Sequence, residues 1–468
     1  MFVALRGEKA DGHQFIGHAI DKGASVIVAE REQKDPRVTC LLVENTRTAL
    51  ADFSTAFYGH PARKLKLAAV TGTNGKTTTT FLIKRICENS GLRCGLIGTV
   101  RYEIGERILP AIRTTPESLD LQELLAQIAN AGCKAAAIEV SSHALAQERA
   151  RGLEWNVAVF TNLTQDHLDF HGTMENYFEA KATLFSGLAA QKQKNKPVAI
   201  VNIDDRYGQH LLRRIDKTVA VVTYGMGLRA DFRASNYRAE FTGTSYQLDA
   251  RGKSYLVRVP LIGRFNVTNS MAALAAADAL GINLRSAVLS LAKAPQVPGR
   301  LELVPAKRQF QVFVDYAHTP DALGNVLKTL RELHPNRLIA VFGCGGDRDR
   351  AKRPLMGEAA GRGSDFVILT SDNPRSEDPL AIINDAMVGL QRSGTKYKTE
   401  PDRKSAIVLA AGEANPGDIV LIAGKGHEKV QITREGSIPF DDVEVAQRVL
   451  RDAGYDCKSS NAAAGKRS

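Results

Sequence analysis

The sequence is poor in cysteine and tryptophan and has no long hydrophobic run. Its six cysteines, at positions 40, 87, 94, 133, 344 and 457, form no CxxC pair and no zinc-ligand spacing, so we expect reduced structural thiols. No apolar run reaches the roughly 18 residues that a membrane helix needs. Met1–Arg6 lack the charged and apolar regions of a signal peptide. We therefore expect a cytoplasmic protein that does not insert into membranes.

The charge of the chain is strongly positive, but the cations are dispersed. The net charge is +11, from 62 Lys and Arg against 51 Asp and Glu. A long basic block is absent and there is a single Trp, a pattern that does not favour nucleic-acid binding. We expect a solvated basic surface that attracts an anionic substrate, and no nucleic-acid partner.

Length and composition indicate several α/β domains. A chain of 468 residues exceeds one compact core, and its 44% hydrophobic residues and 39 glycines are typical of α/β proteins. We predict a first domain over 1–63, a second over 64–297, a third over 298–457 and a disordered tail over 458–468. Apolar runs alternate with helical stretches in the second and third domains, which predicts parallel sheets with crossover helices.

Three local features refine this organisation. Residues 229–262 carry short alternating segments that predict an antiparallel patch. In the first domain the pattern predicts a helix over Asp11–Gly23, and Pro61–Lys64 has the composition of a linker.

A glycine-rich turn at Thr71–Thr80 is the most informative stretch of the chain. It follows the apolar run Leu65–Val70 and precedes a helix-like stretch at 81–86, which is the layout of a phosphate-binding loop. The glycines and the helix start direct backbone N–H groups toward a phosphate. Lys76 would reach a terminal phosphate and the Thr77 hydroxyl would ligate Mg²⁺. The spacing between the glycines is shorter than usual, and an ordinary turn is the alternative.

Polar motifs follow apolar runs in both large domains. Since ligands bind at the carboxyl edge of parallel sheets, these motifs predict a site between two domains. They are Glu139–His143, Thr161–Leu163, Asp315–His318, Gly343–Arg350, Asp372–Arg375 and Gly424–Glu428.

Lys181 lies in an unusual sequence context. Apolar residues at 177, 178, 184 and 185 form one stripe of a helix, and Lys181 falls in its middle. A buried lysine loses its charge readily, and a neutral amine can react. The alternative is a lysine whose head group extends from the helix edge into water.

Two further candidates follow strand ends in the second domain. Glu139 is a metal ligand or a hydrogen-bonded structural carboxylate. His167 lies among two His and two Asp within the six residues 166–171, which suits metal binding or general-base catalysis, although a polar loop explains it too.

The third domain carries charges of both signs that suit an amino acid. Arg348 and Arg375 can bind a carboxylate, while Asp372 and Glu428 can hold an ammonium. Surface salt bridges are the alternative. The segment Asp315–His318 precedes a helix and suits ribose or a metal, or serves as a helix cap.

In their order along the chain, these motifs resemble the Mur ligases of peptidoglycan synthesis. Thr114–Pro116, Gly263–Asn266 and Gly299–Glu302 add to the resemblance, which runs from residue 2 to about 450. The family implies a UDP-binding domain, a central ATPase domain and a C-terminal Rossmann-like domain. Family members extend further before the position of Phe2, so we expect the first domain to be incomplete.

The resemblance also implies roles for individual residues. The UDP-MurNAc-dipeptide would contact Glu8, Lys9, Ala10, Arg113, Thr114, Thr115, Ser141, Gln147 and Arg149. ATP would contact Gly72, Thr73, Asn74, Gly75, Lys76, Thr77, Thr78, Asn266, Arg300 and Asp315. Mg²⁺ would be held by Thr77, Glu139, His167 and a carbamylated Lys181. Diaminopimelate would contact Arg348, Asp372, Asn373, Pro374, Arg375, Gly424 and Glu428.

The function implied is that of an ATP-dependent amide ligase. It would add meso-2,6-diaminopimelate to the D-Glu γ-carboxylate of UDP-MurNAc-L-Ala-D-Glu through an acyl phosphate, with Lys76, Glu139, His167 and Lys181 catalytic. We expect a monomer. The alternatives are a lysine-adding ligase, a folylpolyglutamate-type ligase, and a nucleotide-binding switch without ligase chemistry. The arginine of Asp372–Arg375 favours diaminopimelate over lysine, because only diaminopimelate has a distal carboxylate to pair with it.

Overall fold

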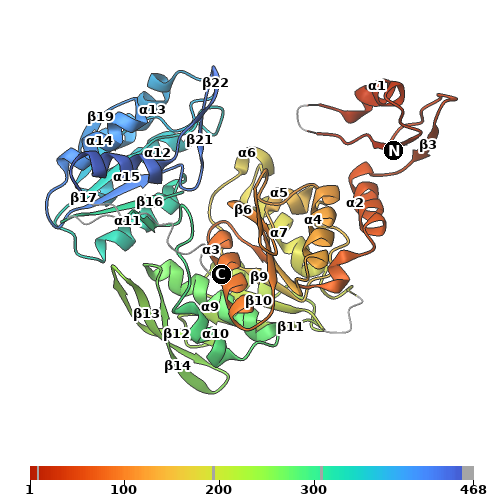
Figure 1. Ribbon diagram of the computed structural model, residues 1–468, viewed down its shortest axis with the longest axis horizontal. Coiled ribbons are helices and arrows are strands. Elements are labelled where there is room, and N and C mark those ends of the chain that lie inside the picture. Colours follow the sequence, from red (N-terminus) through yellow and green to blue (C-terminus); the bar gives the residue numbers. More distant parts are fainter. Residues whose placement is uncertain (8–9, 192–195, 306–308, 456–468) are drawn as a thin grey trace, which may run out of the picture.

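Three bodies follow one another along the chain in the computed structural model, which describes residues 1–7, 10–191, 196–305 and 309–455. Figure 1 shows the N-terminal body at the upper right, the central body in the middle and the C-terminal body at the upper left. The predicted contacts Glu8 and Lys9 and the predicted tail over 458–468 lie outside the described residues. The boundaries predicted at residues 63 and 297 stay predictions.

The N-terminal body is a small parallel sheet with little core. Its strands β1 (Phe2–Val3), β2 (Val26–Ala29) and β3 (Thr39–Leu42) pair in that order. The helix predicted over 11–23 is instead a 3-10 turn η1 (Gly12–Phe15) followed by the shorter α1 (Ile16–Asp21). Helix α2 (Thr46–Phe57), capped by Asn45, connects this body to the central one.

The predicted linker at 61–64 is a packed structural element. It forms the 3-10 helix η2 (Pro61–Lys64), and the side chains of Pro61 and Ala62 are buried. It packs against α4 (Ser118–Asn130), so the N-terminal and central bodies are joined here by a packed segment and not by an extended linker.

The central body is built on an eleven-stranded sheet. Its parallel strands are β5 (Cys94–Ile97), β8 (Ala135–Glu139), β4 (Lys66–Thr71), β9 (Val157–Phe160), β10 (Val198–Asn202) and β11 (Ala220–Gly225). One edge continues into β12 (Phe232–Glu240), which pairs with β11 in parallel. The strands β13 (Gly243–Ala250) and β14 (Lys253–Val259) follow it with antiparallel pairing, which is the predicted antiparallel patch. The other edge carries the antiparallel pair β6 (Arg101–Ile104) and β7 (Arg107–Pro110), which the sequence pattern did not predict.

Helices cover both faces of this sheet, which explains the uninterrupted apolar runs of its central strands. One core joins the sheet to α3 (Lys76–Asn89), α9 (Arg264–Ala279) and α10 (Leu284–Leu291). The opposite core joins it to α4, α7 (Met174–Ser186) and α8 (Arg206–Leu212). The short helices α5 (Ser142–Ala146) and α6 (Leu168–His171) lie at the carboxyl edge of the sheet.

The C-terminal body is a second layered α/β unit. Its sheet has the order β15 (Glu302–Leu303), β16 (Gln311–Asp315), β20 (Ile419–Ala423), β17 (Leu338–Phe342), β18 (Phe366–Leu369) and β19 (Lys396–Thr399), with only β15 antiparallel. Helices α11 (Pro320–Arg331), α12 (Lys352–Gly363) and α13 (Pro379–Ser393) cover one face. Helices α14 (Arg403–Glu413) and α15 (Asp442–Asp452) cover the other, and β21 (Val430–Thr433) and β22 (Gly436–Pro439) form a hairpin.

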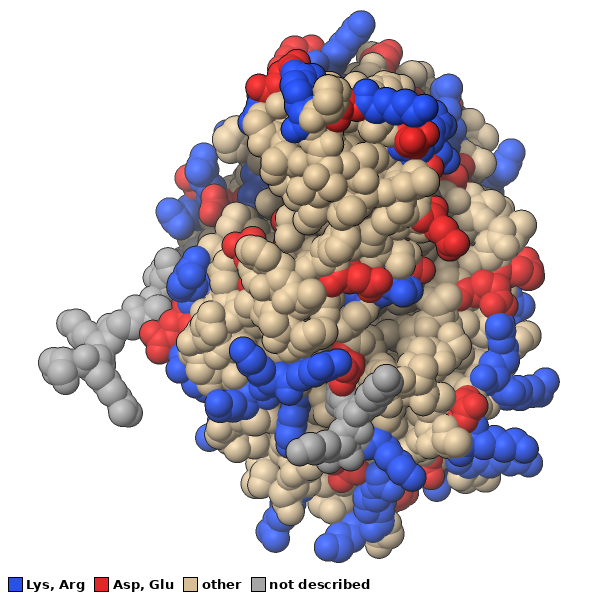
Figure 2. All heavy atoms as spheres, turned by 90° about the vertical axis from the view of Figure 1, so that its right-hand side faces the viewer, with Lys and Arg blue, Asp and Glu red and all other residues tan. Residues whose placement is uncertain are grey.

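The surface is charged but mixed on the face that Figure 2 shows. Lys and Arg alternate there with Asp and Glu around a broad neutral area. This distribution agrees with the solvated basic surface expected from the sequence. Among the described residues, none of the helices combines the length and the hydrophobicity that crossing a bilayer requires.

Candidate functional site

The turn between β4 and α3 has the backbone of an anion cradle. Gly75 takes a positive φ of 87° and precedes the first turn of α3, whose N–H groups face the cavity side. At Gly72, φ is 145° and a Cβ would lie 1.9 Å from the Thr161 Oγ1. A side chain at position 72 is therefore excluded by the neighbouring strand end, which holds the turn close to the sheet.

Two lysines meet at this turn. Lys76 Nζ donates to the carbonyl oxygens of Gly72 and Thr73, both at 2.9 Å. Lys181 Nζ donates to the same Gly72 oxygen at 2.9 Å and lies 4.7 Å from the ring centroid of Tyr177. Lys181 is 1% exposed, and burial, with Lys76 nearby, lowers its pKa well below the usual value. Burial also lowers the pKa of Lys76. The interpretation of Lys181 as a surface lysine is wrong.

Glu139 is the acidic centre of the turn. It ends β8, is fully buried, and its Oε2 accepts hydrogen bonds from the Thr77 hydroxyl at 3.0 Å and the Thr99 hydroxyl at 2.9 Å. Arg300 Nη2 from the C-terminal body reaches the Thr77 hydroxyl at 3.1 Å. Thr77 and Glu139 thus place two oxygen ligands side by side, the type that Mg²⁺ prefers.

A cavity of about 440 Å³ lies over this turn. It is lined by eight of the residues predicted for ATP, namely Thr73, Asn74, Gly75, Lys76, Thr77, Thr78, Arg300 and Asp315. Asn266 does not line it; its Oδ1 accepts a hydrogen bond from Asn269 Nδ2 at 3.0 Å, and Asn269 does line it. Phe265 and Asn269 were missed by sequence reasoning, although both lie in or next to the Gly263–Asn266 motif.

His167 and Glu139 both line the smaller cavity, while Lys181 lies behind the turn and lines neither large cavity. Burial lowers the pKa of His167 to about 4, against the raising effect of Asp166. His167 is therefore neutral near pH 7. Among the described residues, His, Cys, Asp and Glu side chains form no group of three or more that could hold a metal ion. A Mg²⁺ ion bound to Thr77 and Glu139 would need further oxygen ligands, which phosphate, water or a carbamate can supply.

Asp315 connects the segment at Leu301 to the cavity. It ends β16, and its two oxygens accept from the backbone N–H groups of Leu301 at 2.6 Å and Ala317 at 2.7 Å. Burial raises the pKa of Asp315 to about 6, while the positive charge of Arg300 acts against this rise. The Arg300 guanidinium lies 4.7 Å from the ring centroid of Tyr316.

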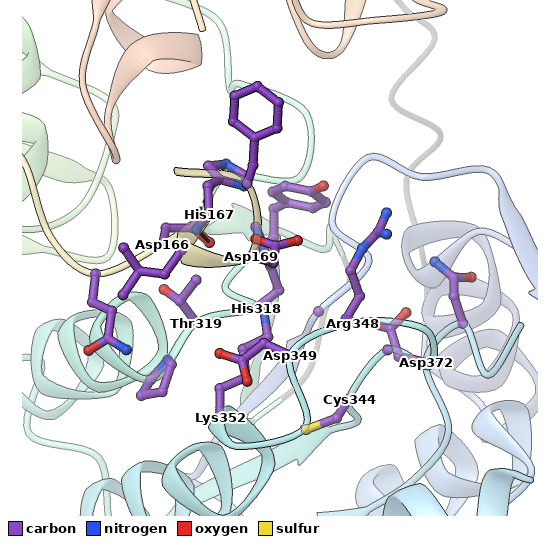
Figure 3. A pocket seen from close by; sticks show the side chains of 18 of the residues that line it. Asp166, His167, Asp169, His318, Thr319, Cys344, Arg348, Asp349, Lys352 and Asp372 are labelled. Carbon is purple, nitrogen blue, oxygen red and sulfur yellow. Dashed lines mark hydrogen bonds and ion pairs between the residues drawn. The ribbon is translucent and has the colours of Figure 1, made fainter. Parts of the chain in front are cut away.

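A larger cavity of about 1060 Å³ separates the central and C-terminal bodies. Figure 3 shows Asp166, His167 and Asp169 from the central body facing His318, Arg348 and Lys352 from the C-terminal body. From the residues predicted for the UDP-dipeptide, it is lined by Arg113, Thr114, Thr115, Ser141 and Arg149. Gln147 and Ala10 line neither large cavity; Gln147 Oε1 instead accepts from Arg149 Nη2 at 2.5 Å.

The residues predicted for diaminopimelate lie on the opposite wall. Arg348, Asp372, Asn373, Arg375, Gly424 and Glu428 line the larger cavity, and Pro374 does not. Arg375 has a positive φ of 54° and its Nη1 donates to the Gly346 oxygen at 2.6 Å. Burial, with Arg348 nearby, lowers its pKa. Burial raises the pKa of Asp372, and its buried Oδ1 has no hydrogen-bond partner in the part of the chain that the structure describes.

Sequence reasoning missed Lys425, a cation inside this wall. Its Nζ lies 3.1 Å from Glu428 Oε2 and 3.7 Å from Asp372 Oδ1, and it donates to Asn373 Oδ1 at 3.0 Å. Asp372 and Glu428, which are predicted to hold the ammonium of the substrate, thus already lie beside the side-chain nitrogen of Lys425. The signal in the sequence was a lysine between Gly424 and Gly426, a spacing typical of a turn that points a side chain inward.

The two cavities share a wall, so ligands bound in them would lie next to each other. Thr114, Ser141, Asp166, His167, Tyr316, His318, Thr319 and Asp321 line both. A phosphate bound at the turn would therefore lie next to a ligand in the larger cavity, itself bordered by paired acidic and basic groups. This is an arrangement for transferring a phosphoryl group to an acid and then joining the acid to an amine.

Known protein families match consecutive parts of the chain. The family described as "Mur ligase family, catalytic domain" matches residues 1–58, the Mur ligase middle domain matches 70–277, and the family described as "Mur ligase, glutamate ligase domain" matches 299–426.

Curated relatives match almost the whole chain. A protein of Solibacter usitatus is 46% identical, covering 97% of this chain and 91% of its own length. One of Geobacillus kaustophilus is 47% identical, covering 97% and 92%. Both are named UDP-N-acetylmuramoyl-L-alanyl-D-glutamate–2,6-diaminopimelate ligase. A solved structure of a ligase of that name has a TM-score of 0.68 at 37% identity, covering 97% of this chain and 92% of that chain.

Proposed function

This chain belongs to the Mur ligase family, and on that premise we propose that it is an ATP-dependent amide ligase. It joins meso-2,6-diaminopimelate to the γ-carboxylate of D-Glu in UDP-MurNAc-L-Ala-D-Glu, a step of peptidoglycan precursor synthesis. The names of the relatives at 46% and 47% identity support this reaction. The observation that supports it most directly is the wall shared by the 440 Å³ and 1060 Å³ cavities.

The smaller cavity takes ATP in this proposal. The amides at the start of α3 and the Lys76 ammonium hold the terminal phosphates. Thr77 and Glu139 would hold Mg²⁺, which supplies neutralisation of phosphate charge. Arg300, already in contact with Thr77 across the domain boundary, brings a further positive charge to the same place.

Lys181 would complete the metal site as a carbamate. Its buried amine has a pKa far below that of a lysine in water, so a larger fraction is neutral and nucleophilic at pH 7. The nitrogen lone pair attacks carbon dioxide, a C–N bond forms and one proton leaves. The product is an anion with oxygen atoms, the ligand type that Mg²⁺ prefers.

The chemistry then runs across the shared wall. The D-Glu γ-carboxylate attacks the γ-phosphorus of ATP and ADP leaves, which converts a poor electrophile into an acyl phosphate. The diaminopimelate amine attacks the acyl carbon, phosphate leaves and the nitrogen loses a proton. The protein contributes mainly positioning and charge neutralisation.

The opposite wall would select the amino acid. Arg375 and Arg348 are proposed to bind the carboxylate at the distal end of diaminopimelate, while Asp372 and Glu428 face its ammonium. Lysine lacks the distal carboxylate, so it would leave Arg375 unpaired in a half-buried position. The structure therefore favours diaminopimelate over lysine on electrostatic grounds.

The test is phosphate release with single omissions. The purified chain, ATP and Mg²⁺ are assayed with UDP-MurNAc-L-Ala-D-Glu and meso-diaminopimelate, with each omitted in turn and with L-lysine or L-glutamate as replacements. We expect rapid release and a product of the tripeptide mass only with both substrates. Equal turnover without an amino acid indicates a nucleotide switch, and a product formed equally well from lysine refutes the assigned specificity.

A further inference from the structure

Lys425 is a fully buried cation that the proposed reaction does not use. Its side chain is 0% exposed. The residue lies on the loop between β20 and β21, and Gly426 beside it has a positive φ of 54°. A Cβ at Gly426 would lie 2.7 Å from the Cβ of Tyr316, so the loop packs closely against the end of β16, and the Lys425 side chain beside it is buried.

The partners of Lys425 are three residues of the amino-acid pocket. Its Nζ contacts Glu428 Oε2 at 3.1 Å and Asn373 Oδ1 at 3.0 Å, and lies 3.7 Å from Asp372 Oδ1. The Asn373 Nδ2 in turn donates to Glu428 Oε2 at 2.8 Å. Asn373 Oδ1 accepts from Lys425 and also from the Ile432 backbone N–H at 2.9 Å. Both groups can only donate, so together they fix which end of the Asn373 amide faces Glu428.

The charges of Lys425, Asp372 and Glu428 do not cancel. Asp372, which is buried, and Glu428, which is partly exposed, border the same nitrogen, and without a cation the two carboxylates would repel one another. With Lys425 these three side chains carry one net negative charge. Asp372 and Glu428 both line the cavity. One further ammonium, supplied from the cavity, would balance that charge.

We propose that Lys425 is a positioning residue for the amino-acid substrate, because it holds Asp372, Asn373 and Glu428 in the arrangement that accepts exactly one additional ammonium. This inference rests on the proposed function. Lys425 acts through its three partners and does not contact the substrate. If Lys425 were removed, Asp372 and Glu428 would repel one another and the Asn373 amide would lose one of its two donors, so the carboxylates would move apart and the pocket would bind the substrate ammonium poorly.

The first experiment separates binding of the amino acid from binding of ATP and of the UDP-dipeptide. Lys425→Met keeps the length of the side chain and removes its charge. We expect the KM for diaminopimelate to rise on the order of 30-fold or more, with the KM values for ATP and the UDP-dipeptide within about twofold of wild type. The matched control is Lys429→Met, because Lys429 is a neighbouring, largely exposed lysine paired with Asp441. It should behave as wild type.

The second experiment tests a background in which the loss of Lys425 should lower the KM for diaminopimelate and not raise it. With Glu428→Gln, Lys425 has Asp372 as its remaining carboxylate and competes with the substrate for it. Adding Lys425→Met to Glu428→Gln should therefore lower the KM for diaminopimelate about tenfold, whereas the same change in the wild type raises it. This pair of variants also gives a result if Lys425→Met alone does not fold, because the double variant has the same net charge of −1 in the cluster of Asp372, Lys425 and Glu428 as the wild type, whereas Lys425→Met alone has −2.

The outcomes are distinct. An unchanged KM for diaminopimelate in Lys425→Met, an equal rise for all three substrates, or a double variant worse than Glu428→Gln each overturns the role of Lys425. Wild-type protein that releases no phosphate in response to an amino acid refutes the proposed function instead.

Discussion

Two buried lysines, Lys181 in the central body and Lys425 in the C-terminal body, have opposite surroundings. Both side chains are at most 1% exposed. Lys181 contacts a backbone carbonyl and the Tyr177 ring, with Lys76 as a neighbouring cation. Lys425 contacts Glu428 and Asn373 and lies beside Asp372.

The difference shows that burial alone does not decide what a lysine can do. Burial and the nearby Lys76 lower the pKa of Lys181 and so favour its neutral amine, which in our proposal is the nucleophile that forms the carbamate. With carboxylates around it, a buried lysine is an ammonium that organises its neighbours. The central body thus contains a buried lysine with a lowered pKa, and the C-terminal body contains a buried lysine beside two carboxylates.

The strongest test of this comparison replaces Lys181. We expect Lys181→Ala to lower kcat by about 10²- to 10³-fold, because an anionic ligand at the phosphate loop is lost. Added acetate or formate should restore part of the activity by occupying the space of the carbamate. The measurement is steady-state phosphate release with and without the anion.

Lys84→Ala is the matched control for that variant. Lys84 is also a buried lysine of the central body, but it pairs with Glu103 at 3.1 Å and with Glu88. Its loss should lower stability without any recovery in acetate. Wild-type turnover in Lys181→Ala, or equal recovery of both variants, would remove Lys181 from the mechanism.

A smaller kinetic effect is expected from replacing Arg375, which lines the larger cavity on the side of the C-terminal body. Arg375→Ala should raise the KM for diaminopimelate by about 10- to 100-fold and leave the KM for ATP within about twofold, because Arg375 is proposed to pair with the amino acid alone. Kinetics with each substrate varied in turn measure the split.

Arg350→Ala is the control on the same segment, since Arg350 is exposed and pairs with Asp385 at 3.4 Å. We expect no change in either KM for this variant. Equal losses for ATP and diaminopimelate in Arg375→Ala would contradict the assignment.

Much of the architecture could be predicted because strand and helix patterns are local. The α/β fold, the family and the antiparallel patch near residue 250 are confirmed. The apolar stripe around Lys181 correctly indicated burial, because all its members lie on one helix. The roles assigned to individual site residues, the domain boundaries and the monomeric state stay predictions.

What the sequence could not provide were contacts between distant segments. Lys425 meets Asp372 across 53 positions of the chain, and Arg300 meets Thr77 across 223. The edge pair β6 and β7 was missed because its strands are short and partly exposed, so their hydrophobic pattern is weak. Pro61–Lys64 was misread as a linker because composition does not reveal that its side chains pack.

The smallest expected effect concerns Asp315, a buried carboxylate that forms no ion pair with a described residue, although Arg300 is nearby, and that is in this respect the acidic analogue of Lys181. Burial raises its pKa from 3.8 to about 6, so it is ionised above pH 6 and takes up a proton below. If Asp315 must be an anion to accept hydrogen bonds from ATP, the KM for ATP should rise about fivefold between pH 6 and pH 5, since one proton must then be released on binding.

Comparison with Asp315→Asn isolates this proton. The phosphates of ATP titrate in the same range, but they do so identically with both proteins, so the ratio of the two KM values reports Asp315 alone. We expect the variant to bind ATP more weakly at pH 7.5 and the ratio to approach one as the pH falls to 5. Asp452→Asn, at an exposed position near the end of α15, should match wild type throughout. A ratio that stays constant with pH would show that the charge of Asp315 does not contribute to ATP binding. The effect of burial on charge would then apply to the buried lysines compared above and not to this carboxylate.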